Sequence, residues 1–152
     1  MLDIIIVSVL AVVATSLFHF SVLKWLSGGM ARIRMSARIR TLVIVLAAMA
    51  AHIPEVVLYA VAYWISIDVF ALGRFGGLAV ERPLDYLYFS SVTYTSLGLG
   101  DVFPLGHVRF LAGVEALNGL LLIAWSGSFI YLAMGRLWPW QTCAVPVRSA
   151  RG

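Results

Sequence analysis

Three long apolar segments restrict this chain to a small set of folds. They cover residues 4–26, 42–67 and 110–134. Each is long enough to cross the hydrocarbon core of a bilayer as a helix, which takes roughly 20 residues. Only 12% of the 152 residues are charged, whereas a soluble domain has roughly 25%. We therefore expect an all-α membrane protein with three transmembrane helices.

A shorter segment, residues 84–96, lies between the second and third spans. It is too short to cross the bilayer but long enough for a re-entrant helix that ends near the membrane centre. Pro83 before it and Asp85 in its first turn are typical of a helix N-terminus. The C-terminal end of such a helix carries partial negative charge, which favours a cation in front of it. Residues 68–83 are predicted to form an outer turret.

The stretch TYTSLGLGD, residues 93–101, overlaps the end of this helix. Gly98 and Gly100 alternate with two leucines, and glycine allows backbone conformations that other residues avoid. If the stretch is extended with its carbonyl groups on one side, their oxygens can replace the water shell of a small cation. The pattern therefore predicts a cation filter.

Together these segments resemble the pore of tetrameric potassium channels. The residues DYLYFSSVTYTSLGLGDVFP are similar to the family pattern ALYFSVVTLTTVGYGD, in which a pore helix precedes the filter. The resemblance implies passive conduction of K⁺. It also implies a homotetramer around a central pore, because the chain has one filter segment and four are needed to surround a cation.

The resemblance assigns roles to individual residues. The ion-binding filter would consist of Thr95, Ser96, Leu97, Gly98, Leu99 and Gly100. Backbone oxygens of Ser96, Leu97, Gly98 and Leu99, with the Ser96 hydroxyl, would hold K⁺. Support for the filter would come from Tyr88, Phe89 and Asp101.

Two residues depart from the family pattern. Ser96 stands where the filter usually has threonine, so the hydroxyl is kept and a methyl group is lost. Leu99 stands where the filter usually has tyrosine, so the outward hydrogen bond of that tyrosine is lost. We therefore expect a less rigid outer filter, and a weakly selective monovalent cation channel stays open as an alternative.

Other classes of protein remain to be distinguished. A potassium-uptake transporter shares the filter but usually has four filter segments in one chain. A non-conducting membrane scaffold or partner subunit is the alternative from a different class. The sequence has no catalytic constellation or phosphate-binding loop, so we expect no enzyme activity, no organic cofactor and no nucleic-acid partner.

The basic residues predict an orientation in the cell membrane. Short loops rich in Lys and Arg stay cytoplasmic, and the first two spans are joined by such a loop, residues 24–40. The N-terminus and the filter would then lie outside and the C-terminus inside. Anionic lipid head groups are possible partners of four arginines in this loop, which are Arg32, Arg34, Arg38 and Arg40.

Ionisable residues inside the spans form a predicted intramembrane polar cluster. Its members are His19, His52, Glu55 and Glu115. A carboxylate within the membrane needs a partner, and for Glu55 we expect His52, His19 or Asn118. The cluster is interpreted as a structural network, with pH-dependent opening or a transition-metal site as alternatives. Glu115 is predicted to lie behind the filter and to bond the pore helix.

Two adjacent residues of the last span match the inner helix of the family. Gly119 lies near its hinge glycine, although close packing against the pore helix would explain it equally well. Asn118 is predicted to face the cavity or to bond Glu55. The expected organisation is an N-terminal helix and basic loop (1–40), a pore domain (41–136) and a short cytoplasmic tail (137–152).

Overall fold

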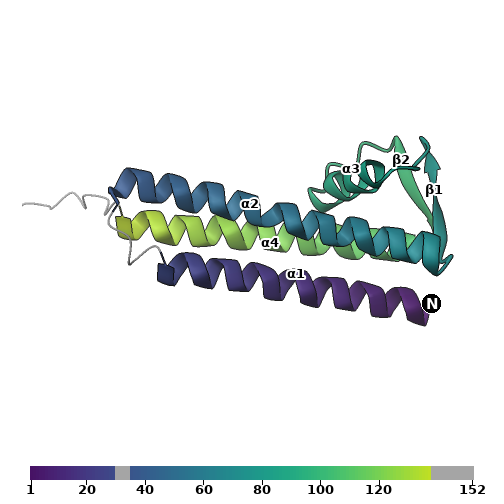
Figure 1. Ribbon diagram of the computed structural model, residues 1–152, viewed down its shortest axis with the longest axis horizontal. Coiled ribbons are helices and arrows are strands. Elements are labelled where there is room, and N and C mark those ends of the chain that lie inside the picture. Colours follow the sequence, from purple (N-terminus) through teal and green to yellow (C-terminus); the bar gives the residue numbers. More distant parts are fainter. Residues whose placement is uncertain (30–34, 138–152) are drawn as a thin grey trace, which may run out of the picture.

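The computed structural model describes residues 1–29 and 35–137, and three long helices dominate it. They are α1 (Leu2–Gly29), α2 (Ala37–Trp64) and α4 (Val108–Leu137). All three are long and apolar enough to cross a membrane, and they run side by side (Figure 1). The three predicted spans are confirmed, and each helix begins before the apolar segment that predicted it.

Helices α1 and α2 both extend into the predicted basic loop, residues 24–40. Ser36 caps α2 by accepting a hydrogen bond from the backbone N–H of Ile39 at 3.5 Å. Arg38 and Arg40 therefore lie in the first turns of α2, so the prediction that they belong to a loop was wrong. Lys24 lies within α1, as the predicted span over residues 4–26 implies. Arg32 and Arg34 lie outside the described residues.

After α2 the chain reverses direction through a short π-helix, η1 (Ile65–Val69), and a two-stranded sheet. Strand β1 (Gly73–Gly77) pairs antiparallel with β2 (Val102–Gly106), with Gly73 opposite Gly106 and Gly77 opposite Val102. A Cβ atom on Gly73 would lie 2.3 Å from a backbone oxygen of β2. The two strands therefore approach so closely that only glycine fits there.

The predicted re-entrant helix is α3 (Pro83–Tyr94). It has Pro83 in its first turn, and Oδ2 of Asp85 accepts the backbone N–H groups of Glu81 and Arg82 at 3.0 and 2.8 Å. These backbone donors lower the pKa of Asp85. A charged cap at the positive end of the helix dipole favours a helix start at this point.

An aromatic cluster holds α3 between α2 and the sheet. The ring of Phe75 on β1 lies 4.6 Å from that of Phe89 and 5.7 Å from that of Tyr86, both on α3. Tyr63 of α2 meets Phe89 edge-on at 5.0 Å. Such contacts are favourable beyond the area that they bury. Phe89, predicted to support the filter, thus anchors the pore helix from behind.

Helix α1 lies against both other long helices. Its buried positions recur along one face, and they include Ser8, Thr15 and His19. His19 contacts α2 and Thr15 contacts α4 through hydrogen bonds. Helix α1 therefore packs against both α2 and α4. Figure 1 places the N-terminal end of α1 at the same end of the bundle as the sheet.

Candidate functional site: the filter segment and the polar networks behind it

The filter segment begins as a continuation of the last turn of α3. The backbone N–H groups of Ser96, Leu97 and Gly98 donate to carbonyl oxygens of α3 at 2.9, 2.9 and 3.3 Å. All described peptide bonds are trans, so the carbonyl before each N–H points in the opposite direction. The carbonyls of Thr95, Ser96 and Leu97 therefore point away from α3 on one side.

Backbone dihedral angles alternate along the same segment. Ser96, Gly98 and Gly100 have φ values of 57°, 56° and 80°, whereas Leu97 and Leu99 between them have negative φ. A backbone whose φ alternates in sign can turn successive N–H groups to one side, as in backbone nests, and the carbonyl groups to the other. The two glycines adopt positive φ without strain. Ser96 does so at a cost of roughly 1–3 kcal/mol, a kind of strain that is concentrated at functional sites.

The side chains of the filter segment project outward from the single chain. Leu97 and Leu99 are 63% and 59% exposed, and a leucine at position 99 has no polar atom to bond α3. Thr95 donates its hydroxyl to the carbonyl of Ser91 at 2.8 Å, within α3. Two apolar side chains beside an aligned row of carbonyls form a surface that fits contact with another chain.

The C-terminal end of the filter segment is fixed by Asp101. Its Oδ2 accepts the Tyr88 hydroxyl at 2.6 Å, its Oδ1 accepts the N–H of Val102, and its carbonyl accepts the N–H of Leu78. The hydrogen bond from Tyr88 lowers the pKa of Asp101. Tyr88 and Asp101, both predicted as filter support, thus contact each other directly.

Glu55 lies at the centre of a buried network behind the filter. Its Oε1 lies 2.8 Å from Nδ1 of His19, and its Oε2 lies 2.9 Å from Nδ1 of His52. The hydroxyl of Tyr94, the last residue of α3, donates to Oε2 at 2.5 Å. The expected partners His19 and His52 are both found, and the third expected partner, Asn118, is not.

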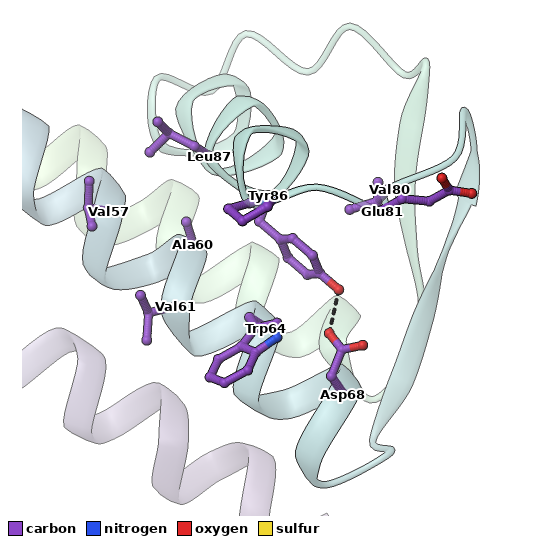
Figure 2. Close-up of a pocket in the computed structure, with 10 residues that line it drawn as sticks. Val57, Ala60, Val61, Trp64, Asp68, Val80, Glu81, Tyr86 and Leu87 are labelled. Carbon is purple, nitrogen blue, oxygen red and sulfur yellow. Dashed lines mark hydrogen bonds between the residues drawn. The ribbon is translucent and has the colours of Figure 1, made fainter.

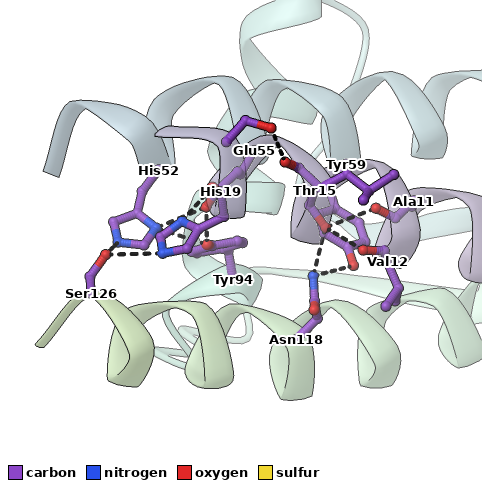
Figure 3. Close-up of polar contacts among 12 residues, drawn as sticks. Ala11, Val12, Thr15, His19, His52, Glu55, Tyr59, Tyr94, Asn118 and Ser126 are labelled. Carbon is purple, nitrogen blue, oxygen red and sulfur yellow. Dashed lines mark hydrogen bonds and ion pairs between the residues drawn. The ribbon is translucent and has the colours of Figure 1, made fainter. Parts of the chain in front are cut away.

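Ser126 closes this network from α4. Its Oγ lies 3.2 Å from Nε2 of His19 and 3.2 Å from Nε2 of His52. Figure 3 shows the two imidazole rings beside each other, with Ser126 at one end and Glu55 at the other. Sequence reasoning missed Ser126 and Tyr94 as members, because a serine or tyrosine in an apolar helix carries no signal of its partner.

The same residues were considered as a metal site. One ligand atom each from His19, His52 and Glu55 lie within 4.8 Å of one another. However, the Nδ1–oxygen separations of 2.8 and 2.9 Å are hydrogen-bond lengths. Two donor atoms on one tetrahedral zinc ion lie about 3.3 Å apart, given bonds of about 2.0–2.1 Å. The geometry therefore favours a hydrogen-bonded cluster.

Glu115 belongs to a different network, so its grouping with the histidines was wrong. It is fully buried and accepts the hydroxyls of Tyr63 and Ser90, each at 2.5 Å. Ser90 lies on α3 and also lies 2.9 Å from the carbonyl of Val56. The expected bond from Glu115 to the pore helix is confirmed, and it connects α2, α3 and α4.

Asn118 and Gly119 have separate surroundings. The Asn118 amide donates to the hydroxyls of Thr15 and Tyr59 at 2.8 and 3.0 Å. The prediction that Asn118 faces the cavity or bonds Glu55 was wrong, because the turn of α4 directs it toward α1 and α2. A Cβ on Gly119 would lie 2.3 Å from the carbonyl oxygen of Tyr94. Gly119 thus permits close packing against the pore helix.

A largely apolar pocket of about 680 Å³ lies between α2 and α3, next to η1. Figure 2 shows Tyr86 crossing it to bond Asp68, which ties the start of α3 to η1. Val57 and Val61 of α2 form its inner wall. Its position behind α3 separates it from the filter segment.

Comparison with known proteins agrees with this geometry. The family described as ion channel matches residues 41–134, which is more than half of the 152 residues. The matched region begins in α2 and ends in α4, so it includes α3 and the filter segment. No curated protein and no solved structure matches the chain. The extent of the family match, together with a re-entrant helix and filter segment between two spans, shows that this chain belongs to the ion channel family.

Proposed function

We propose that this channel conducts K⁺ passively through a filter built from residues 95–100. The observation that carries the proposal is the alignment of successive carbonyl groups away from α3, set by backbone bonds and alternating φ. A row of carbonyl oxygens can take the place of the hydration shell of K⁺. Ions would be bound by backbone oxygens of Ser96, Leu97, Gly98 and Leu99 and by the Ser96 hydroxyl.

One chain supplies one row of oxygens, so the proposal requires four copies around a central axis. The exposed leucines of the filter segment support such an assembly, because apolar side chains beside a filter would be covered by a neighbouring copy. Residues 41–136 would form the pore domain. Residues 1–40 would form the N-terminal helix and basic loop, and residues 137–152 a short cytoplasmic tail. Chemical crosslinking in mild detergent should give species of up to four chains. A monomer or dimer would contradict the proposal.

The proposed orientation places the filter and the N-terminus outside the cell membrane and the C-terminus in the cytoplasm. It is supported by the excess of basic residues predicted on the inner side. Anionic lipid head groups would contact the arginines at the start of α2, Arg38 and Arg40, together with Arg32 and Arg34.

The ion selectivity of the channel is tested by its reversal potential. We expect the protein in liposomes, under a K⁺-to-Na⁺ gradient, to show a reversal potential near the K⁺ equilibrium value. A reversal potential near zero with clear current would instead establish the alternative, a weakly selective cation channel in which Leu99 has loosened the filter. A tetramer without current would favour a non-conducting scaffold.

A pair of glycine variants tests whether the current passes through the filter. Gly98 has φ of 56°, so Gly98→Ala forces a Cβ into a left-handed conformation and should abolish the current. Gly28, within α1, has no atom within 4 Å of a built Cβ, so Gly28→Ala should conduct normally. Equal currents from both variants would exclude this filter as the ion path.

A further inference from the structure

The network around Glu55 is separate from the proposed ion-coordinating atoms, yet it joins the four α-helices of the described residues. It contains His19 of α1, His52 and Glu55 of α2, Tyr94 of α3 and Ser126 of α4. The side chains of His19 and Glu55 are fully buried, and that of His52 is 19% exposed. A buried ionisable group within a membrane span is by default a functional site.

Counting protons defines the charge of this cluster. Each contact between an imidazole Nδ1 and a carboxylate oxygen of Glu55 needs one proton between the two atoms. The Ser126 hydroxyl has one proton but faces two Nε2 atoms. It can donate to only one of them, so the other Nε2 must carry a proton of its own and donate to Ser126.

All contacts are therefore satisfied at only one number of bound protons. Relative to an ionised Glu55 and two neutral imidazoles, that state holds one additional proton, on a histidine or on the carboxyl group. Its net charge is zero. Removing the proton leaves a buried negative charge on Glu55. One imidazole Nε2 lone pair then faces a lone pair of the Ser126 oxygen. Adding a second proton leaves a buried positive charge and displaces the Ser126 proton. Both changes are costly in a membrane interior.

One further carboxyl group, Glu115 of α4, interacts electrostatically with Tyr94, and it accepts the hydroxyls of Tyr63 and Ser90. On α2 the nearest titratable neighbour is Tyr59, whose ring lies 6.5 Å from that of Tyr94. On α4 the contacts are Ser126 and Trp125, whose ring lies 5.5 Å from His19. Among the described residues, α1 contributes His19 alone and α3 contributes Tyr94 alone.

We propose that this cluster is a proton-binding site whose occupancy is transmitted to the filter through Tyr94. Tyr94 is bonded to Glu55, its hydroxyl lies 2.9 Å from Nδ1 of His52, and it directly precedes the filter residues Thr95 and Ser96. His52, whose side chain is 19% exposed, also borders a cavity of about 320 Å³ that is lined in part by Tyr94 and Thr95.

In the state that satisfies every contact, the site holds one additional proton and is uncharged. Acidification adds a second proton, and the positive charge beside the inner part of the filter disfavours cations there. Conduction should therefore fall as the pH falls. The proposal rests on membership of the ion channel family but not on K⁺ selectivity, because any permeant cation responds to this charge.

The proton count is tested by ¹⁵N NMR of histidine side chains in the assembled protein. The chain has three histidines, so the variant His107→Gln leaves only the two in the cluster. At about pH 7.5 we expect two unlike rings, either one imidazolium and one neutral ring or two neutral rings of opposite tautomer. Two neutral rings of the same tautomer, or two imidazolium rings, would overturn the proposed state. This measurement does not depend on conduction.

Coupling to the filter is tested by cation flux into liposomes at about pH 7.5 and pH 5.5, the range in which histidine titrates. We expect flux to fall at least about threefold in the wild type, because a positive charge near the ion path repels cations. The matched control His107→Gln, at an exposed histidine outside the cluster, should show the same fall.

Two variants within the cluster complete the test. His52→Gln removes one titrating ring, and Ser126→Ala removes the single donor while both rings remain. In each variant the flux should fall by less than about 1.5-fold between the two pH values. His52→Gln lacks a ring that can take up the second proton, and Ser126→Ala lacks the hydroxyl that defines the neutral state. A wild-type flux that is unchanged with pH would overturn the coupling, and so would an undiminished fall in both variants.

Discussion

At the scale of single residues, the hydroxyl of Tyr88 fixes the outer end of the filter segment. It donates to Asp101 at 2.6 Å, and this bond lowers the pKa of the carboxyl group. A carboxylate with a lowered pKa contributes its stabilisation at pH values above its ordinary pKa and loses it as the pH falls through the lowered value. The hydrogen bond therefore holds the outer filter at neutral pH and is lost only in acid.

The variant Tyr88→Phe should raise the pKa of Asp101 toward its ordinary value, because the phenol donor is gone. A carboxyl ¹³C NMR titration should show Asp101 protonating at higher pH in the variant than in the wild type. Tyr131, an exposed tyrosine at the other end of α4, gives the control Tyr131→Phe, which should leave the titration unchanged. An unaltered Asp101 titration in Tyr88→Phe would contradict the contact.

Gly119 makes a second prediction at this scale. A Cβ at this position would lie 2.3 Å from the Tyr94 carbonyl oxygen, so Gly119→Ala must move α3 away from α4. We expect a loss of about 1–3 kcal/mol in stability, as for other overpacked sites, measured by thermal unfolding in detergent. Gly135→Ala, on the same helix with open space around the built Cβ, should be neutral. Equal melting temperatures for both would refute the close contact.

At the scale of elements, one attachment of α3 to the bundle is a hydrogen bond to a buried carboxylate. Ser90 donates to Glu115 at 2.5 Å. Ser90→Ala should leave one oxygen of Glu115 without a donor and destabilise the fold by about 1–3 kcal/mol. Ser91 bonds only the carbonyl of Leu87 in its own helix, so Ser91→Ala is the matched control. Chemical unfolding that ranks Ser91→Ala as the more damaging change would disprove this role.

The elements differ in how far the sequence predicted them. The long helices were predictable because a span of roughly 20 apolar residues has few other solutions. The start of α3 was predictable because Pro83 and Asp85 act locally. Strand β1 was not, because its sequence, GRFGG, lacks the alternation of apolar and polar residues that marks a strand. Its place depends on β2, more than twenty residues further along the chain.

Partners across helices were harder to predict than the helices themselves. The sequence shows that Glu55 needs a partner, and His52 follows from the helical repeat. The bond to Tyr94 depends on the rotation of α3, which no local pattern sets. Asn118 was harder to predict for the same reason. No local pattern sets the rotation of α4, and the Asn118 amide faces Thr15 and Tyr59.

At the scale of the whole molecule, the path of the chain makes a prediction about its orientation. The N-terminal end of α1 lies at the same end of the bundle as the sheet (Figure 1), so the N-terminus and the outer end of the filter should share one side of the membrane. Because basic residues in short loops favour the cytoplasmic side, that shared side should be the outside. The C-terminal tail should then lie in the cytoplasm.

The single cysteine, Cys143, allows a direct measurement, although it lies outside the described residues. In intact cells a membrane-impermeant maleimide should leave Cys143 unlabelled and should label it once the membrane is opened. Leu2 is 69% exposed, and Leu2→Cys combined with Cys143→Ala should be labelled in intact cells. The opposite labelling pattern would show that the molecule has the inverted orientation, with the filter facing the cytoplasm. Labelling of both positions from one side would contradict three membrane crossings, because an odd number of spans separates the two ends.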